Sequence, residues 1–344
     1  MIMIINITLT IRLTMFCNSQ LKFLASVALS FGVISCGSAT ENNPSTPTGV
    51  ENSVVNQSTQ QQPLVVATNT VICGLTKEIA RDTIDLKCLI DPGSDPHVYQ
   101  PKPDDSKAIE QAKLILYGGH DFEPGLIKLI KATTNPAPKV AVHEIAVPNP
   151  QKFQEDGQTV ADPHVWQNAQ NGIAIAETIA QELVKLSPKN TATYTTNSKK
   201  LTQEITQIDT WIKSQIATIP EAQRKLVTTH DAFGYYSQAY QIKIQGALEG
   251  ISTEEAPTPA RVGALAKEIQ KEKVPTIFAE TTINPKLIQA VAKEAKVKVA
   301  EQELFADGLG EKGSAGETYQ QMLIANTKTI VEGLGGKYTE FKPQ

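Results

Sequence analysis

The stretch that decides the fold of this chain is residues 190–217, NTATYTTNSKKLTQEITQIDTWIKSQIA. Apolar residues recur along it at intervals of four, three, four and four positions, namely Leu201, Ile205, Ile208, Ile212 and Ile216. This spacing places the five side chains on one face of an α-helix, so the stretch predicts a single long helix packed against a core. Strand-like segments lie on both sides of it. We therefore expect this helix to connect two lobes rigidly.

Strand-like and helical segments alternate before this helix. The predicted strands are Leu64–Thr68, Ile84–Ile90, Leu114–Tyr117 and Lys139–His143, and the first predicted helix is Leu75–Ala80. Continuous apolar runs such as the first strand are typical of strands buried in a parallel sheet. Alternating strands and helices predict βαβ units. We place an N-terminal α/β lobe at residues 63–187.

The same alternation follows the long helix, which with its flanking residues spans 188–222. The predicted strands are Leu226–Thr228, Pro275–Ala279 and Lys298–Ala300, and the predicted helices are Thr258–Lys271, Asn284–Ala295 and Thr318–Leu334. Thr258 is a suitable helix cap, and Pro259 suits the first helical position. We place a C-terminal lobe at residues 223–344. The expected fold class is α/β, with two lobes that each contain a mostly parallel sheet and flanking helices.

Residues 1–36 are not expected to belong to the folded body. Lys22 precedes the apolar run Phe23–Ile34, which is too short to span a membrane comfortably, and small residues then flank Cys36. This pattern predicts a signal peptide with a sequence that resembles a bacterial lipobox, cleaved before a lipid-modified Cys36. Ordinary signal cleavage beside an incidental cysteine is the alternative. Residues 37–62 are rich in Ser, Thr, Asn, Gln and Pro, which predicts a disordered tether.

The charge balance argues against nucleic acid as a partner. Residues 1–36 carry two basic residues and no acidic one, so the rest of the chain has 30 basic and 36 acidic residues. Phosphate binding needs clustered Lys and Arg, and the sequence contains no such basic stripe.

Two cysteines, Cys73 and Cys88, remain beyond the export segment. Exported proteins enter an oxidising compartment, so we expect a disulfide between them. The alternative is a pair of buried thiols that pack as small apolar residues. Metal ligation by these cysteines is not expected, because neither has a CxxC partner.

Three of the five histidines occur in similar settings. The tripeptide Asp-Pro-His ends at His97 and again at His164, and His230 closely follows the strand Leu226–Thr228. Proline restricts the residue before it to extended conformations, so each tripeptide presents its imidazole from a stiffened loop. Imidazole is the commonest protein ligand for zinc-like metals, and α/β proteins place ligand sites at strand ends. These three histidines therefore predict a metal site.

Asp307 is the best candidate for a fourth ligand, because it follows the segment Val299–Phe305 at a strand end that faces the same cleft. An aspartate before a glycine is also a common turn residue. Two other histidines compete for a place in the site: His120, beside Asp121, and His143, beside Glu144.

The chain resembles the zinc and manganese solute-binding proteins of bacterial ABC importers. The matching segments are Pro92–Pro101, Asp162–Trp166, Thr229–Tyr236, Ile277–Glu280 and Ala306–Gly310. The similarity covers about Leu64 to Leu334. It implies two α/β lobes joined by one helix, with one divalent metal ion in the cleft between them. The family's ligand positions correspond to His97, His164, His230 and Asp307.

The ligand set leaves the identity of the metal open. Three imidazoles and one carboxylate suit tetrahedral zinc, and they also suit manganese if the carboxylate binds through both oxygens. Zinc-specific relatives often carry a histidine-rich loop before the second histidine, whereas the corresponding stretch here, Pro148–Ala161, has no histidine. Intrinsic affinity at such a site favours zinc over manganese. Both ions therefore remain candidate cargoes.

Together these features predict a non-enzymatic, monomeric protein on the periplasmic or cell-surface side of a membrane, anchored by an N-terminal lipid. It would capture zinc or manganese and deliver the ion to an ABC permease and its ATPase. A secreted zinc hydrolase is the first alternative, with Glu280 as its general base. A fourth protein ligand and the absence of HExxH and GxSxG argue against it, and we expect Glu280 in the cleft wall instead. A surface adhesin of the same fold, active in cell adhesion, is the second alternative.

Overall fold

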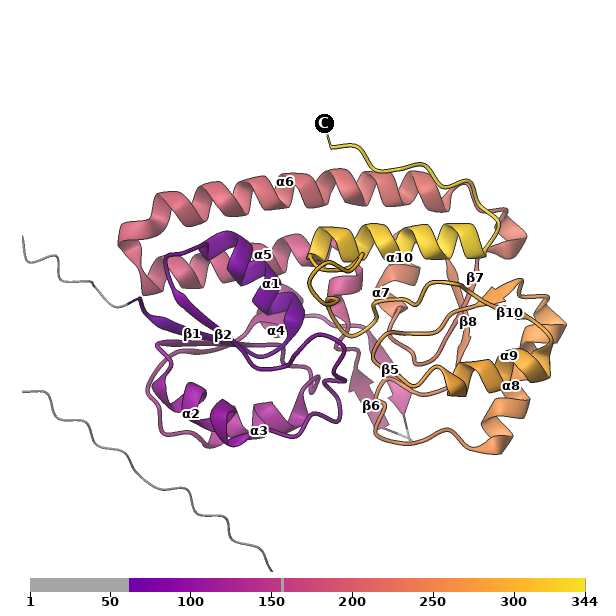
Figure 1. The fold of residues 1–344 in the computed structure, drawn as a ribbon, viewed down its shortest axis with the longest axis horizontal. Helices are drawn as coiled ribbons and strands as arrows, with labels where there is room; N and C mark the ends of the chain where they lie inside the picture. The colour runs from indigo at the N-terminus through magenta and orange to yellow at the C-terminus, as the bar shows by residue number, and fades with distance from the viewer. Residues whose placement is uncertain (1–61, 156–157, 344) are drawn as a thin grey trace, which may run out of the picture. The chain divides into compact units, whose positions relative to one another are not determined.

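A computed structural model of the chain describes residues 62–155 and 158–343 (Figure 1). The predicted signal peptide, with Cys36, and nearly all of the predicted tether lie outside the described residues. Within the part of the chain that the structure describes, no helix is both long and apolar enough to cross a membrane. The fold is α/β, with two lobes on either side of a cleft.

The first lobe contains a sheet of four parallel strands in the order β2-β1-β3-β4. The strands are β1 (Leu64–Ala67), β2 (Asp85–Cys88), β3 (Leu114–Tyr117) and β4 (Lys139–Ala141). Side chains of β1 alternate between two cores, as the period of a strand requires. Val65 and Ala67 join one core, and Val66 joins the other. The sheet is therefore covered on both faces.

Four helices of the first lobe pack against this sheet. They are α1 (Thr70–Ala80), α2 (Pro103–Gln111), α3 (Pro124–Ala132) and α5 (Ala169–Leu186). Helices α1 and α5 cover one face of the sheet, and α2 and α3 cover the other (Figure 1). The carboxyl ends of β1, β2 and β3 then point toward the second lobe, which brings the loops after them to the cleft (Figure 1).

The second lobe contains two parallel strand pairs and four helices. They are β7 (Lys225–Thr228) with β8 (Lys243–Ala247), β9 (Thr276–Ile277) with β10 (Lys298–Val299), and the helices α7 (Gly234–Tyr240), α8 (Pro259–Glu272), α9 (Lys286–Ala295) and α10 (Tyr319–Gly333). A hydrogen bond of 2.9 Å from the Phe278 N–H to the Val227 carbonyl places β9 beside β7. Residues of α8 and α9 pack with Val227 and Ile277 in a separate core.

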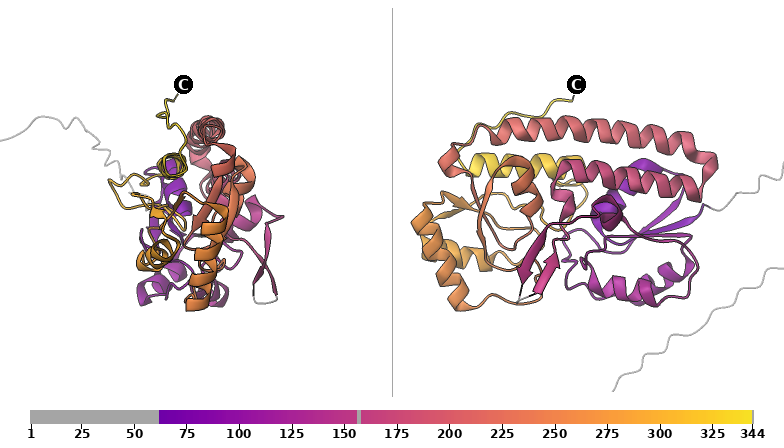
Figure 2. Two further views of the ribbon diagram at one scale, coloured as in Figure 1. Left: turned by 90° about the vertical axis from the view of Figure 1, so that its right-hand side faces the viewer. Right: turned by 180° about the vertical axis from the view of Figure 1, so that it is seen from behind.

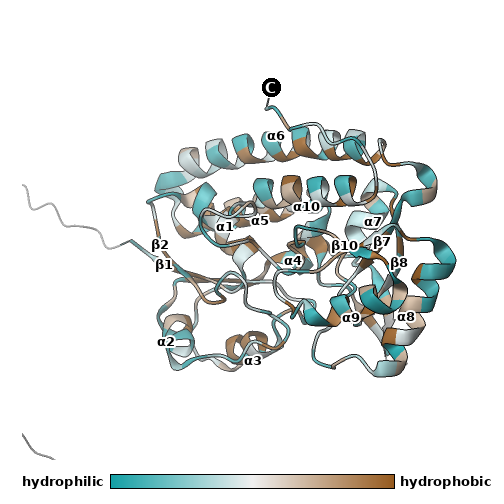
Figure 3. Cartoon of the chain, turned by 45° about the vertical axis from the view of Figure 1, so that its right-hand side comes forward, coloured by the Kyte–Doolittle hydropathy of each residue, from teal (hydrophilic) through white to brown (hydrophobic). Residues whose placement is uncertain are grey.

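The long helix predicted between the lobes is confirmed as α6 (Thr191–Ile216), 26 residues in length. All five apolar residues of its predicted stripe are buried. The helix runs along α5 of the first lobe and α10 of the second (Figures 1 and 2). Hydrophobic positions alternate with hydrophilic ones along it, as expected for a helix with one buried face (Figure 3). Helix α6 therefore packs in a core that continues from the first lobe into α7 and α10 of the second.

Two predicted boundaries were wrong for identifiable reasons. Helix α1 begins at Thr70 rather than Leu75, because the Asn69 side chain caps it by accepting a hydrogen bond from the Ile72 N–H. The predicted strand at Lys139–His143 ends at Ala141, which pairs with the last residue of β3. Beyond that point the strand has no ladder partner, and the chain forms the short helix α4 (Val142–Ala146).

The sequence did not predict the antiparallel hairpin β5 (Lys152–Glu155) and β6 (Gln158–Ala161), which precedes the second Asp-Pro-His. It also did not resolve three short 3-10 helices, η1 (Val165–Gln167), η2 (Pro188–Asn190) and η3 (Glu221–Gln223). The hairpin ends where the second histidine loop begins, so it borders the cleft.

The two cysteines connect the first helix to an edge strand. Cys73 of α1 and Cys88 of β2 are bonded to each other, with their Cα atoms 5.8 Å apart and a separation of 15 positions in sequence. The bridge closes the β1-α1-β2 unit just before the loop that carries His97.

Candidate metal centre

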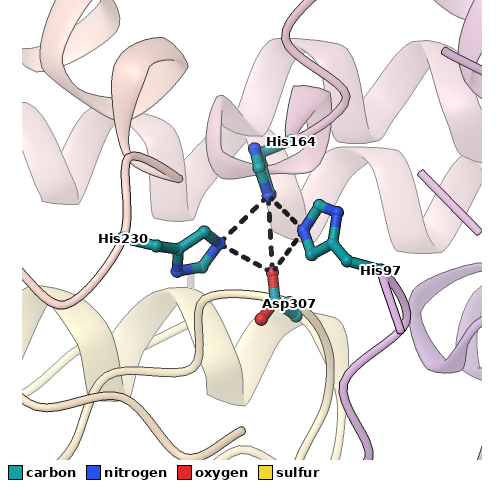
Figure 4. Close-up of side chains that lie close together, drawn as sticks. All are labelled: His97, His164, His230 and Asp307. Atoms are coloured by element: carbon teal, nitrogen blue, oxygen red, sulfur yellow. Dashed lines mark hydrogen bonds and ion pairs between the residues drawn. The ribbon is translucent and has the colours of Figure 1, made fainter. Parts of the chain in front are cut away.

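Four side chains converge in the cleft between the lobes (Figure 4). His97 lies in the loop after β2 and His164 lies just before η1, so both come from the first lobe. His230 follows β7 and Asp307 follows β10, so both come from the second. All four are buried, and His97 is the most exposed at 4%. Their ligand atoms all lie within 4.8 Å of one another. The structure thus brings together the four residues that the sequence indicated.

The distances between these atoms fit a tetrahedral ion. Asp307 Oδ1 lies 3.5 Å from the Nε2 atom of His97, 3.4 Å from that of His164 and 3.1 Å from that of His230. His164 Nε2 lies 3.3 Å from the Nε2 atoms of both other histidines. Atoms about 2.0–2.1 Å from a tetrahedral zinc ion are about 3.3 Å from one another. Five of the six distances among the four atoms are therefore close to the edge of a zinc tetrahedron, and the sixth, between the Nε2 atoms of His97 and His230, is at most 4.8 Å.

Carboxylates orient two of the three imidazoles from behind. Asp162 Oδ1 lies 2.8 Å from His164 Nδ1 and also accepts the His164 backbone N–H. Glu280 bonds to His230 Nδ1 through Oε2, and its Oε1 accepts the backbone N–H groups of Thr229 and His230. A carboxylate on Nδ1 keeps a proton on that nitrogen, so that Nε2, once it gives up its own proton, offers its lone pair to the centre. Both rings are therefore preset for binding a cation.

The two Asp-Pro-His loops share a turn but differ beyond it. Asp95, like Asp162, accepts the backbone N–H of the histidine two residues later, here at 3.0 Å. Its second oxygen accepts a hydrogen bond of 2.6 Å from the Thr253 hydroxyl of the other lobe. The His97 ring packs edge-on against Phe122, with ring centroids 5.2 Å apart. The first loop thus links the lobes, while the second orients its own imidazole.

In the cluster, the ionised form of Asp307 and the protonated forms of His230 and His164 stabilise one another. Burial acts to raise the pKa of Asp307, but the His230 charge and hydrogen bonds from the three imidazoles hold that pKa well below its usual value. Burial acts to lower the pKa of His230, yet Asp307 and Glu280 together raise that pKa well above its ordinary value. The pKa of His164 is raised in the same way, against its burial, by Asp162 and Asp307. The site is therefore built to stabilise positive charge.

Side chains next to His164 bond to the backbone next to Asp307. Trp166 Nε1 donates to the Ala306 carbonyl at 3.1 Å. Gln167 Nε2 donates to the carbonyls of Phe305 and Ala306 at 3.0 and 2.8 Å. These bonds join the loops of the two lobes, so the separation between His164 and Asp307 does not depend on a bound ion alone.

The two competing histidines do not join the cluster. His120 lines a cavity of about 460 Å³ next to His97, together with Asp121 and Glu254, and its backbone N–H is bonded to Glu144. His143 is fully buried behind the rings of Phe122 and Trp166. Burial, with the charges of His120 and His164, lowers the pKa of His143 to about 3, so this imidazole is neutral.

Several residues around the centre were missed by sequence reasoning. Glu280 was expected only in the cleft wall, and its bonds to His230 were not foreseen. Glu249 is a further buried carboxyl group near the centre, where it interacts with the charges of His230 and Asp307, and its backbone N–H bonds to the Thr229 carbonyl. Burial, partly offset by the His230 charge, raises the pKa of Glu249 to about 7. The position of Glu280 directly after a strand was the signal in the sequence, whereas Glu249 offered none.

Comparison with known proteins gives consistent matches. The family model described as "Zinc-uptake complex component A periplasmic" matches residues 65–333. The metal ABC transporter substrate-binding lipoprotein SsaB of Streptococcus sanguinis is 36% identical over 277 residues, covering 78% of this chain and 88% of that protein. The manganese ABC transporter substrate-binding lipoprotein scaA of Streptococcus gordonii is 34% identical over 321 residues, covering 91% of this chain and 98% of that protein.

Solved structures agree with these matches. The periplasmic zinc binding protein TroA from Treponema pallidum superposes with a TM-score of 0.75 at 32% identity, covering 79% of this chain and 99% of that one. The Fe(III)-bound YtgA of Chlamydia trachomatis has the same fold, with a TM-score of 0.71 at 24% identity, covering 81% of this chain and all of that one.

Proposed function

The chain belongs to the family described as zinc-uptake complex component A, and we propose that it binds its cargo ion through His97, His164, His230 and Asp307. It is an exported solute-binding protein of a metal ABC importer and not an enzyme. Its cargo is a divalent transition metal, zinc or manganese. The observation that carries the proposed ligand set is the convergence of three Nε2 atoms on Asp307 Oδ1 at 3.1–3.5 Å.

The arrangement of partners around the ligands supports capture rather than catalysis. A catalytic zinc keeps three protein ligands and one open position for water. Here Asp307 takes the fourth position of a tetrahedron. The supporting bonds from Asp162 and Glu280 lie on the far side of the rings, directed away from the centre. A secreted hydrolase is therefore not favoured.

We further infer how the protein is attached and with what it works. Cys36 would carry the lipid, and residues 37–62 would tether the folded body to the membrane. Two relatives at 34–36% identity are named as lipoproteins of ABC transporters, which supports the anchor. The partner would be a permease with its ATPase, which receives the ion from a monomer. A change of Cys36 to Ser is expected to release the protein from the membrane fraction.

Titration of metal-free protein tests the ligand set. Zinc should bind at one ion per chain in the unaltered protein. The double variant His164→Ala, His230→Ala should lose this binding, because it removes two of the three nitrogen ligands. His143→Phe is the matched control, since that histidine is buried outside the cluster, and it should bind zinc as the unaltered protein does. Full zinc affinity in the double variant would overturn the assignment.

A further inference from the structure

The two oxygens of Asp307 have different partners. Oδ1 faces the three imidazoles, while Oδ2 is turned away from them (Figure 4). Oδ2 accepts a hydrogen bond of 2.6 Å from the hydroxyl of Thr282. Asp307 is only 1% exposed, so water does not compete freely for this oxygen. One carboxylate oxygen is thus available to an ion, and the other is already engaged by the protein.

The backbone around Thr282 fixes the position of its hydroxyl. Glu280 pairs with Leu304 in a parallel bridge, and the Thr281 N–H donates to the Leu304 carbonyl at 3.0 Å. The segment from Glu280 to Thr282 therefore runs beside the segment that leads to Asp307. Glu280 bonds to His230 and, two residues later, Thr282 bonds to Asp307. One short segment after β9 positions both ligands of the second lobe.

The number of oxygens that Asp307 offers affects which ion fits. With Oδ1 alone, the protein supplies four ligand atoms, which matches the tetrahedral preference of zinc. Manganese prefers more and harder oxygen ligands, and binding through both carboxylate oxygens would supply one more. Oδ2 has a second lone pair, but it is held facing the Thr282 hydroxyl, so the carboxylate must turn and strain that hydrogen bond before both oxygens can reach the ion. A hydrogen bond to a charged carboxylate is stronger than a neutral one, so its loss is costly.

Resting on the proposed function, we propose that Thr282 is a specificity-determining residue that restricts Asp307 to one oxygen and so favours zinc over manganese. Its hydroxyl donates to the oxygen that manganese would need. The residue does not touch the ion. It acts by positioning the carboxylate.

The test compares the affinities of the same protein for the two ions. Thr282→Val removes the hydroxyl and preserves the branched shape, and Thr282→Ala is measured beside it in case the valine variant does not fold. Thr282→Ser keeps the hydroxyl and serves as the conservative variant. Thr281→Val is the matched control, because Thr281 lines a separate cavity beside α10. Dissociation constants for Zn²⁺ and Mn²⁺ are measured by competition titration of the metal-free proteins.

In the variants without the hydroxyl, the ratio of the manganese to the zinc dissociation constant should fall about tenfold, the equivalent of about 1.4 kcal/mol. Thr282→Ser and Thr281→Val should keep the ratio of the unaltered protein. If Thr282 has only a structural role, its replacement would weaken the binding of both ions equally and leave the ratio of the dissociation constants unchanged. That result would overturn the proposal. A manganese-bound crystal structure of the unaltered protein with both Asp307 oxygens on the ion would also overturn it. Failure of the proposed ligand set would appear differently, as an unaltered protein that binds neither ion at one per chain.

Discussion

At the scale of single residues, the centre depends on the groups that bond to the ligands as well as on the ligands themselves. The aspartates of the two Asp-Pro-His tripeptides have different hydrogen-bond partners. Asp162 reaches the ring of His164, whereas Asp95 reaches across to Thr253 of the other lobe. One aspartate therefore sets the basicity and orientation of its imidazole, and the other helps to close the cleft.

Replacing Asp162 by Asn is expected to lower zinc affinity about 10–100-fold, the usual effect of removing a carboxylate behind a ligating histidine. The amide is uncharged, so it no longer increases the basicity of His164. Asp95→Asn is the matched control, because Asp95 bonds to the His97 backbone N–H and Asp162 to the His164 ring. Isothermal titration of both variants measures the difference. Equal affinities for the two variants would contradict the role assigned to Asp162.

The buried His143 should make the metal-free protein sensitive to acid. Its pKa is about 3 in the fold, below the value of about 6.5 expected in the unfolded chain. Between these two pKa values the unfolded chain binds a proton at this histidine that the folded chain excludes, so acid favours unfolding. Its stabilising contribution is complete above about pH 6.5 and is lost as the pH falls from there toward about 3.

His143→Phe removes this titration, since an aromatic ring of similar size stays uncharged. The melting temperature of the variant should fall less between about pH 6.5 and about pH 4 than that of the unaltered protein. Thermal unfolding followed by circular dichroism at several pH values measures this. Parallel curves for the two proteins would show that His143 does not titrate between the folded and unfolded states.

At the scale of secondary structure elements, the disulfide should contribute to the stability of the β1-α1-β2 unit. A loop of about 15 residues closed by a disulfide is worth about 3 kcal/mol in the chain-entropy model. The double variant Cys73→Ser, Cys88→Ser should therefore unfold at lower denaturant concentration by about that free energy. The unaltered protein in reducing buffer is the control, and it should match the variant. An unchanged unfolding midpoint would indicate that the bond does not form in solution.

The elements also show how far the sequence could predict the fold. Apolar runs and the 3.6-residue period located β1, β3 and α6, because these elements are buried along a whole strand or face. The hairpin β5–β6 and helix α4 were missed, since short, half-exposed segments carry little periodic signal. The strand at Lys139 was predicted too long, because its end is set by the length of its neighbour β3.

The candidate site likewise contains ligands that the sequence could indicate and supporting contacts that it could not. The sequence pointed to His97, His164, His230 and Asp307 through a repeated tripeptide, strand ends and a family resemblance. The bonds of Glu280, Thr282 and Gln167 join residues that are distant in sequence from the groups they contact. No local pattern encodes such contacts, so they become visible only when the two lobes are placed together.

At the scale of the whole molecule, each lobe contributes two of the four proposed ligands. Bonds between the lobes already exist beside the centre, from Gln167 to the Phe305 and Ala306 carbonyls and from Thr253 to Asp95. An ion would add four further bonds across the same cleft. We therefore expect capture to stabilise an arrangement that the protein already favours, with little rearrangement of the imidazoles.

The most direct test of the central claim is to locate the cargo ion by anomalous diffraction from crystals of the zinc-loaded protein. We predict one anomalous peak in the cleft, about 2.0–2.2 Å from the Nε2 atoms of the three histidines and from Asp307 Oδ1. A zinc peak elsewhere, for example in the cavity beside His120, with none among these four atoms, would contradict the account.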